Sequence, residues 1–300
     1  MYKIFLLTSL FVLLNFSPPK TASAQALTSS RIELAGQQIT LAHKLVRAIC
    51  FAEAGIERER HLKLAIETRN TLDATLLGLI EGNADLGIMA ETDGTTLTLL
   101  SSVQKVWNPL RKKVDAYLAG EPYTTKNVTK LSFKSDSLQK LWANIISRYE
   151  LKSTVTGGSG NLELARLMNA ASHQSSLIQQ AGKLSCLVWL NGGPEKAKHQ
   201  MGQLETVLPN FHTNTFGLTF SHPDAGLPIP PTDQIQNSNF AVWQTWVSVN
   251  DMFDATLNGT ATKAQLAELS HSIEFLNQSL DEIMPLYTQL DTTSQQISEM

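Results

Sequence analysis

The chain has two cysteines, Cys50 and Cys186, and their side-chain chemistry could constrain the fold more directly than that of any other residues. In an oxidising compartment the two sulfurs could form a disulfide. A free cysteine is also a common small buried hydrophobic residue, so each thiol could instead lie in a core of its own. The sequence leaves both possibilities open, because it does not give the distance between the two sulfurs.

Two glutamines and two histidines are further candidates for binding. Gln38 and Gln174 occupy matched positions of a repeat described below, where their amides could hydrogen-bond a ligand. The alternative is a polar residue on a solvated face or on a face between two modules. His61 and His199 also match, and each follows a glutamate by one helical turn. A Glu-x-x-x-His pair supplies too few ligands for tetrahedral zinc, so it indicates a solvated surface pair.

The sequence carries no recognisable catalytic motif. It contains neither Gly-x-Ser-x-Gly nor His-Glu-x-x-His, and the run 157–160 lacks the lysine and the preceding strand of a phosphate-binding loop. The formal net charge of −3 leaves no basic stripe that could neutralise nucleic-acid phosphates. We therefore expect a protein that is not an enzyme, with no cofactor, no metal ion and no nucleic-acid partner.

The first 24 residues have the pattern of a secretory signal peptide. Lys3 supplies the positive charge, Ile4–Phe16 the apolar run and Ala22-Ser23-Ala24 a small-residue cleavage site. A helix of that apolar length would span roughly 20 Å, short of the roughly 30 Å hydrocarbon core, which disfavours a membrane anchor. We expect cleavage before Gln25. The mature protein would then lie in an exported compartment, for which a bacterial periplasm is the first candidate.

The sequence repeats itself at a shift of about 136 to 139 residues. The matched pairs are collinear and need only small insertions or deletions, which chance rarely supplies. They include Gln38 with Gln174, Arg47 with Lys183, Cys50 with Cys186, His61 with His199, Leu79 with Leu218, Trp107 with Trp246, Leu138 with Leu276 and Tyr149 with Tyr287. We interpret the repeat as a tandem duplication.

Each copy is predicted to contain four amphipathic helices. Ser30 with Glu33 would form a capping box that opens the first helix, and Thr262 with Gln265 would cap the last. The third helix has the clearest pattern, because its apolar residues recur in steps of three and four. These residues are Leu100, Val103, Trp107, Leu110, Val114 and Tyr117.

Four helices in each copy, without an alternating strand pattern, predict an all-α fold of two tandem antiparallel four-helix bundles related by internal duplication. The expected organisation is a signal peptide at 1–24, a first bundle at 30–154, a linker at 155–161 and a second bundle at 162–297.

The pattern over Ile32–Leu45 resembles the first helix of the periplasmic sensor domain shared by nitrate/nitrite sensor kinases and pilus-linked chemoreceptors, the PilJ/NarX type. The matching residues are Ala35, Gly36, Leu79, Gly82 and Trp107 in the first copy, and Ala171 and Trp246 in the second. The resemblance implies a four-helix sensor bundle that dimerises and binds a small ligand between two first helices. Here the two copies could face each other as protomers would, so we expect a monomer with an internal pseudo-dimer.

The family motif also carries an arginine suited to a trigonal oxyanion, and this sequence lacks it. Its position is occupied by Ile39 in the first copy and by Ser175 in the second. His43, Arg47 and the matching Lys183 lie further along the same stripe. They could form a displaced anion site, or they could be cations on a partly solvated helix face. We therefore predict no useful nitrate or nitrite binding, and a neutral polar ligand if one binds.

These observations predict an exported, non-catalytic binding protein of the sensor type. It would capture a small ligand or relay it to a membrane-bound sensor kinase or chemoreceptor. The candidate ligand-binding residues are Gln38, His43, Arg47, Gln174 and Lys183. The alternative is an envelope scaffold, associated with a pilus or a secretion system, that kept the bundle and lost ligand binding.

Overall fold

The computed structural model describes residues 20–155 and 162–298. Over these residues the chain is all-α, as the sequence predicts, with two short 3-10 turns at Pro194–Lys196 and Pro223–Ala225. The helices are α1 (Lys20–Glu53), α2 (Arg58–Glu81), α3 (Gly94–Leu118), α4 (Thr125–Val155), α5 (Leu162–Leu190), α6 (Lys198–Phe220), α7 (Asp233–Leu257) and α8 (Lys263–Ser298).

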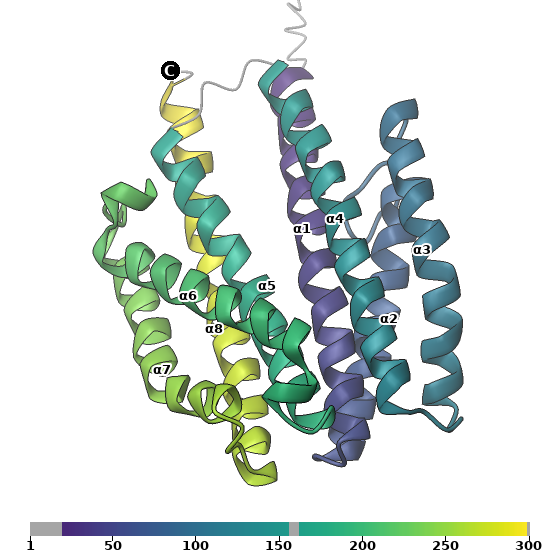
Figure 1. Cartoon of the computed structure of the whole chain (residues 1–300). Coiled ribbons are helices and arrows are strands. Elements are labelled where there is room, and N and C mark those ends of the chain that lie inside the picture. The colour runs from purple at the N-terminus through teal and green to yellow at the C-terminus, as the bar shows by residue number, and fades with distance from the viewer. Residues whose placement is uncertain (1–19, 156–161, 299–300) are drawn as a thin grey trace, which may run out of the picture.

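The helices form two antiparallel groups of four, α1–α4 and α5–α8, that lie side by side (Figure 1). Helix α1 packs against α2, α4 and α5, and α5 packs against α1, α6 and α8. The two helices α1 and α5 are therefore central, and each half contributes one of them to the interface. No helix among the described residues is long and apolar enough to cross a membrane.

The apolar seams predicted for the third helix of each half lie in the core. All six seam residues of α3 are buried, and so are Val242, Trp246, Val249 and Phe253 of α7. In α3 the Trp107 indole donates to Asp73 Oδ1 at 2.6 Å, and in α7 the Trp246 indole donates to His212 Nδ1 at 3.1 Å. Both tryptophans thus bury their rings and satisfy their single polar group.

Some helix boundaries differ from the expected ones. The capping box at Thr262 and Gln265 is confirmed, because each side chain bonds the other residue's backbone N–H. The capping box at Ser30 is wrong: α1 begins at Lys20, so Ser30 lies inside the helix. The fourth helix begins at Thr125, about three turns earlier than its apolar pattern indicates. The predicted signal peptide and linker lie mostly in residues 1–19 and 156–161, outside the described residues.

Several local features recur at matched positions in the two halves. The turn after α2 is closed by a bridge between Asn83 and Ile88, and the turn after α6 by a bridge between His222 and Leu227. The helices that follow are capped alike: the Asp93 side chain accepts from the backbone N–H of Thr96, and Thr232 accepts from that of Ile235. A duplication predicts such pairs, although the duplication itself stays a prediction.

Candidate functional site

The five predicted binding residues lie on the two central helices and are buried. Gln38, His43 and Arg47 belong to α1, and Gln174 and Lys183 belong to α5. None of them is more than 1% exposed. The interpretation of these side chains as solvated is therefore wrong. Because α1 and α5 pack against each other, the face of α1 that carries Arg47 and the face of α5 that carries Lys183 each point towards the other half of the molecule.

Arg47 reaches across the interface to the last helix of the second half. Its guanidinium forms an ion pair with Glu274 of α8, and its Nε donates to Gln179 Oε1 of α5 at 2.8 Å. Lys44, one turn earlier, places its Nζ 3.1 Å from the other carboxylate oxygen of Glu274. The Arg47 side chain, which is 0% exposed, is thus held by partners from the second half alone.

Lys183 makes the reciprocal contact. From α5 its Nζ reaches Asp136 Oδ1 of α4 at 2.6 Å and Ser135 Oγ at 3.4 Å. Asp136 and Glu274 are themselves matched by the shift that relates Leu138 to Leu276. The basic residue of each central helix therefore pairs with a carboxylate on the last helix of the opposite half. We call these two contacts the crossed ion pairs.

The crossed ion pairs occupy the place where the sequence allows a displaced anion site. Each cation already has a carboxylate within the protein, so a small anion would have to displace Glu274 or Asp136 from a largely dehydrated interface. Ile39 and Ser175, at the family's arginine position, are also nearly buried. The Ser175 hydroxyl donates to Asp281 at 3.4 Å, which places a further negative charge there. The interface is therefore poorly suited to an oxyanion.

A disulfide joins the two central helices close to their C-terminal ends. The bond connects Cys50 of α1 with Cys186 of α5, whose Cα atoms are 6.1 Å apart. Of the two arrangements that the sequence left open, the structure has the bridge and not two separate buried thiols. The halves are thus linked covalently as well as by the crossed ion pairs.

Replacing both cysteines by alanine should lower the free energy of unfolding by about 2–4 kcal/mol. The bridge spans a sequence separation of 136 residues, so it removes much conformational entropy from the unfolded chain. Urea unfolding of the oxidised and the double-alanine protein measures the difference. Thiol titration in denaturant without reductant should find no reactive thiol, and two free thiols would contradict the bridge.

Gln38 and Gln174 point into the cores of their own halves and not into the interface between them. Gln38 borders a cavity of about 10 Å³ between α1, α2, α3 and α4, beside Trp107 and Trp142. Such a cavity has room for about one water molecule. Gln174 Oε1 accepts a hydrogen bond from Thr215 at 3.2 Å. The Nε2 atoms of both glutamines are buried and have no hydrogen-bond partner among the described residues.

The two matched histidines have different surroundings. His199 is exposed on α6, tilted against Phe133 at 5.2 Å. His61 is buried, which corrects the expectation of a surface pair: its ring stacks on Phe51 and its Nε2 lies 3.1 Å from Ser270 Oγ. Burial, followed by the charges of Arg47 and Arg60, lowers the pKa of His61 to about 3. Burial also lowers the pKa of His43 well below its usual value, and Lys183 lowers it further.

These low histidine pKa values predict acid sensitivity. In the unfolded chain the His61 imidazole titrates near pH 6.5, whereas in the folded chain its pKa is about 3. Between these values the unfolded state binds a proton that the folded state does not, so the free energy of unfolding falls as the pH drops below about 6.5. The loss is up to about 1.4 kcal/mol per pH unit for each such histidine. His61→Gln should flatten the pH dependence of stability between about pH 4 and pH 6, and parallel curves would contradict the assignment.

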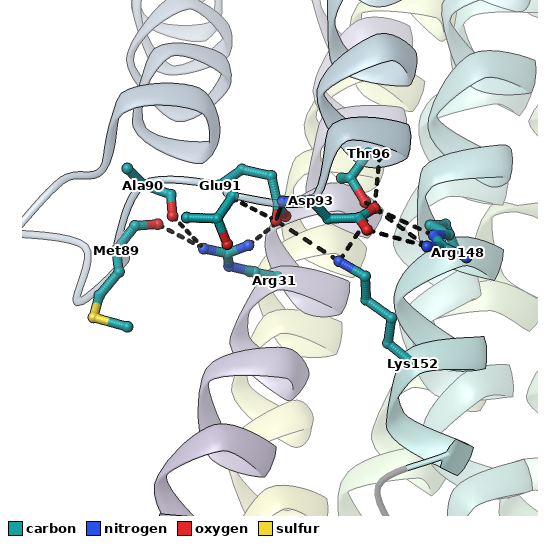
Figure 2. Close-up of polar contacts among 9 residues, drawn as sticks. Arg31, Met89, Ala90, Glu91, Asp93, Thr96, Arg148 and Lys152 are labelled. Carbon is teal, nitrogen blue, oxygen red and sulfur yellow. Dashed lines mark hydrogen bonds and ion pairs between the residues drawn. The ribbon is translucent and has the colours of Figure 1, made fainter.

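A polar cluster that the sequence analysis did not predict joins α1, α4 and the loop after α2, at the other end of α1 from the disulfide (Figure 2). Arg31 of α1 forms an ion pair with Glu91 and donates to the Met89 carbonyl at 2.6 Å. Asp93, which caps α3, lies 3.1 Å from an Arg148 nitrogen and 3.3 Å from the Lys152 Nζ of α4.

The hydrogen bond from Thr96 and then the one from Arg148 hold the pKa of Asp93 well below its usual value. The cluster binds the loop after α2 to α1 and α4. An aspartate three residues before Thr96, at the start of a helix, was the available signal for its capping member.

A larger hollow lies on the surface of the second half, between α5 and α6. Its volume is about 390 Å³, and it is lined by Gln180, Lys198, His199, Gly202, Gln203, Thr206 and Val207. It contains none of the five predicted binding residues. Within the described ranges, no group of histidine, cysteine, aspartate and glutamate side chains could hold a metal ion.

Residues 21–131 match the family model PilJ, described as type IV pili methyl-accepting chemotaxis transducer N-term. The match covers nearly all of α1, all of α2 and α3, and the beginning of α4. It confirms the predicted resemblance to the PilJ family over residues 21–131 and does not extend to the predicted second copy. No curated protein and no solved structure matches the chain.

Proposed function

We propose that the chain is an exported, non-catalytic sensor-type module that works by contact with a membrane-bound chemoreceptor or sensor kinase. The observation that carries the proposal is the closed interface between α1 and α5, which the crossed ion pairs and the disulfide fill. The PilJ-type match of residues 21–131 supports the chemoreceptor context. The signal-peptide pattern of residues 1–24 supports a periplasmic location.

The internal interface takes the place of dimerisation. The first helices of two sensor protomers would face each other, and here α1 and α5 of one chain do so. A second copy is then unnecessary for this contact, so the chain acts as a monomer with an internal pseudo-dimer. Because the interface is already filled, a signal to the partner has to pass through the outer surface of the molecule. Contact with a protein partner is therefore favoured over capture of an anion.

Nitrate should not bind with physiologically useful affinity. Arg47 is paired with Glu274 and Lys183 with Asp136, so an entering anion would lose free energy in separating either pair. Calorimetric titration should give no dissociation constant below about 100 µM. Tighter binding that Arg47→Ala abolishes and the charge-keeping Arg47→Lys retains would overturn this prediction and restore an anion sensor.

Cross-linking in the source organism tests the proposed function. The full-length chain, cross-linked in intact cells and analysed by mass spectrometry, should be joined to a membrane protein with a methyl-accepting or histidine-kinase domain. Deleting the chain should then change the signalling output of that receptor. Cross-links confined to pilus or secretion components, with receptor output unchanged, would favour the scaffold alternative. A metabolite that raises the melting temperature in proportion to its concentration would favour direct ligand capture.

A further inference from the structure

The outer side of the second half carries an exposed aromatic surface. It is formed by Phe216 and Phe220 of α6 and by Phe240, Trp243 and Val247 of α7, which we call the outer aromatic face. The rings form a contiguous set: Phe216 lies 5.6 Å from Trp243, and Phe220 lies 6.0 Å from both Trp243 and Phe240. Phe216, Phe220 and Phe240 are each about 40% exposed, and Val247 is 53% exposed. Helix α7 lies away from α1–α4 (Figure 1). Helix α6 meets α4 through His199 and Gln203 near its N-terminal end, whereas Phe216 and Phe220 lie near its C-terminal end.

The first half has the same helix order without such a surface. The positions of the first half that match the outer aromatic face by the repeat are Leu77, Glu81, Ser101, Gln104 and Asn108. Four of these five residues are polar, yet α2 and α3 pack against their half in the same order. The aromatic residues of the second half are therefore an addition to the common fold. Large contiguous apolar patches on soluble proteins mark interaction sites.

Acidic residues lie at both ends of the outer aromatic face. Asp233, Phe240, Val247 and Asp254 are spaced seven residues apart on α7, and all four are exposed. Residues seven apart lie on one side of a helix, so this stripe has an apolar middle and an acidic residue at each end. The sequence has no lysine or arginine between Lys198 and Lys263 that could neutralise these ends. The two aspartates lie roughly 30 Å apart along the helix axis.

We infer that the outer aromatic face is the docking surface for an amphipathic helix of a partner protein, with an apolar middle and a lysine or arginine near each end. Aliphatic side chains would cover the rings, and the basic residues would meet Asp233 and Asp254. The inference rests on the proposed function, since it names the surface through which the receptor contact would be made.

Two other occupants fit the charges less well. Anionic lipid headgroups attract lysine and arginine, which this surface lacks, and they would be repelled by its aspartates. A second copy packed antiparallel on α7 would bring Asp233 of one chain against Asp254 of the other, which is a like-charge contact. A helix with basic ends has neither disadvantage.

Binding of two designed peptides to the whole chain tests the inference. Both peptides are helices of about 22 residues with the same leucine stripe, one with lysine and the other with glutamate at its two ends. Fluorescence anisotropy at low salt should show at least about tenfold tighter binding of the lysine-ended peptide. The double variant Asp233→Lys, Asp254→Lys should reverse that preference, which a structural role of these aspartates would not do.

Variants that copy the first half provide the matched controls. Phe240→Ser with Trp243→Gln installs the residues of the matching positions and should weaken binding of the lysine-ended peptide at least about tenfold. Leu77→Ala, which removes an exposed apolar residue at the matching face of the first half, should leave the affinity unchanged. The melting temperature of each variant shows whether it is folded.

Three results would overturn the inference. Equal affinity for the two peptides, unaffected by Phe240→Ser with Trp243→Gln, would show that the outer aromatic face is not a docking surface. Binding to phosphatidylcholine–phosphatidylglycerol vesicles that these substitutions abolish, without peptide binding, would make it a lipid surface. A dimer in light scattering that the same variant dissociates would make it a contact between copies. If the peptides behave as expected and no signalling receptor cross-links, the proposed function fails while the docking chemistry stands.

Discussion

Glu274→Ala should lower the free energy of unfolding by about 3–5 kcal/mol. The carboxylate of Glu274 is the acidic partner of Arg47, whose side chain is 0% exposed. Without it the guanidinium stays buried with only the neutral partners Gln179 and Ser270. An uncompensated buried charge costs more than the ion pair itself contributes, so removal of one partner is the damaging change. Urea unfolding of the oxidised protein measures the loss.

Two controls separate this effect from a general loss of packing. Arg47→Met combined with Glu274→Leu removes both charges, and its stability should lie within about 1–2 kcal/mol of the original protein. Glu67→Ala removes one partner of the exposed pair Lys63–Glu67, whose charged atoms are 3.9 Å apart, and should change stability by less than about 0.5 kcal/mol. If Glu274→Ala and the double variant lower the free energy of unfolding equally, the unpaired charge of Arg47 would not be the cause of the loss.

Trp246→Ala should lower the free energy of unfolding by a similar amount, about 3–5 kcal/mol. The indole is 1% exposed, and its ring lies 4.7 Å from Phe211 and 5.6 Å from Phe253. Alanine would leave a large cavity in the core of the second half. Trp246→Phe keeps most of the packing and loses the hydrogen bond to His212 and part of the ring volume, so its cost should be smaller than that of the alanine variant, below about 2 kcal/mol. Trp107→Ala is the matching test in the first half, and no loss in either alanine variant would contradict the seams.

The fold could be predicted from the sequence because its strongest signals are local. The steps of three and four from Leu100 to Tyr117 identify one buried face of one helix, and the same pattern around Trp246 identifies its match. Local patterns place helix ends less well. Ser30 with Glu33 has the residue types of a capping box, yet both residues lie inside α1, so these residue types alone do not locate the helix start.

The surroundings of the site residues could not be predicted, because they depend on contacts between distant segments. Periodicity shows that His43 and Arg47 share a face of α1, but not that this face meets α5 and α8. Arg47 and Glu274 are separated by most of the chain, and no sequence pattern links them. His61 shows the same limit: it has the spacing of an exposed pair, whereas its burial comes from Phe51 and Ser270, which tertiary packing brings to it.

The disulfide has a mechanical consequence. Cys50 and Cys186 fasten α1 to α5 near one end, and along the same interface Arg47 and Lys183 anchor each central helix to the opposite half. A sliding displacement of α1 past α5 by one turn would require about 5 Å of travel, which a covalent bond between their side chains forbids. The two central helices can therefore not act as a piston. Under the proposed function, a signal would have to pass by a route other than sliding of α1 along α5.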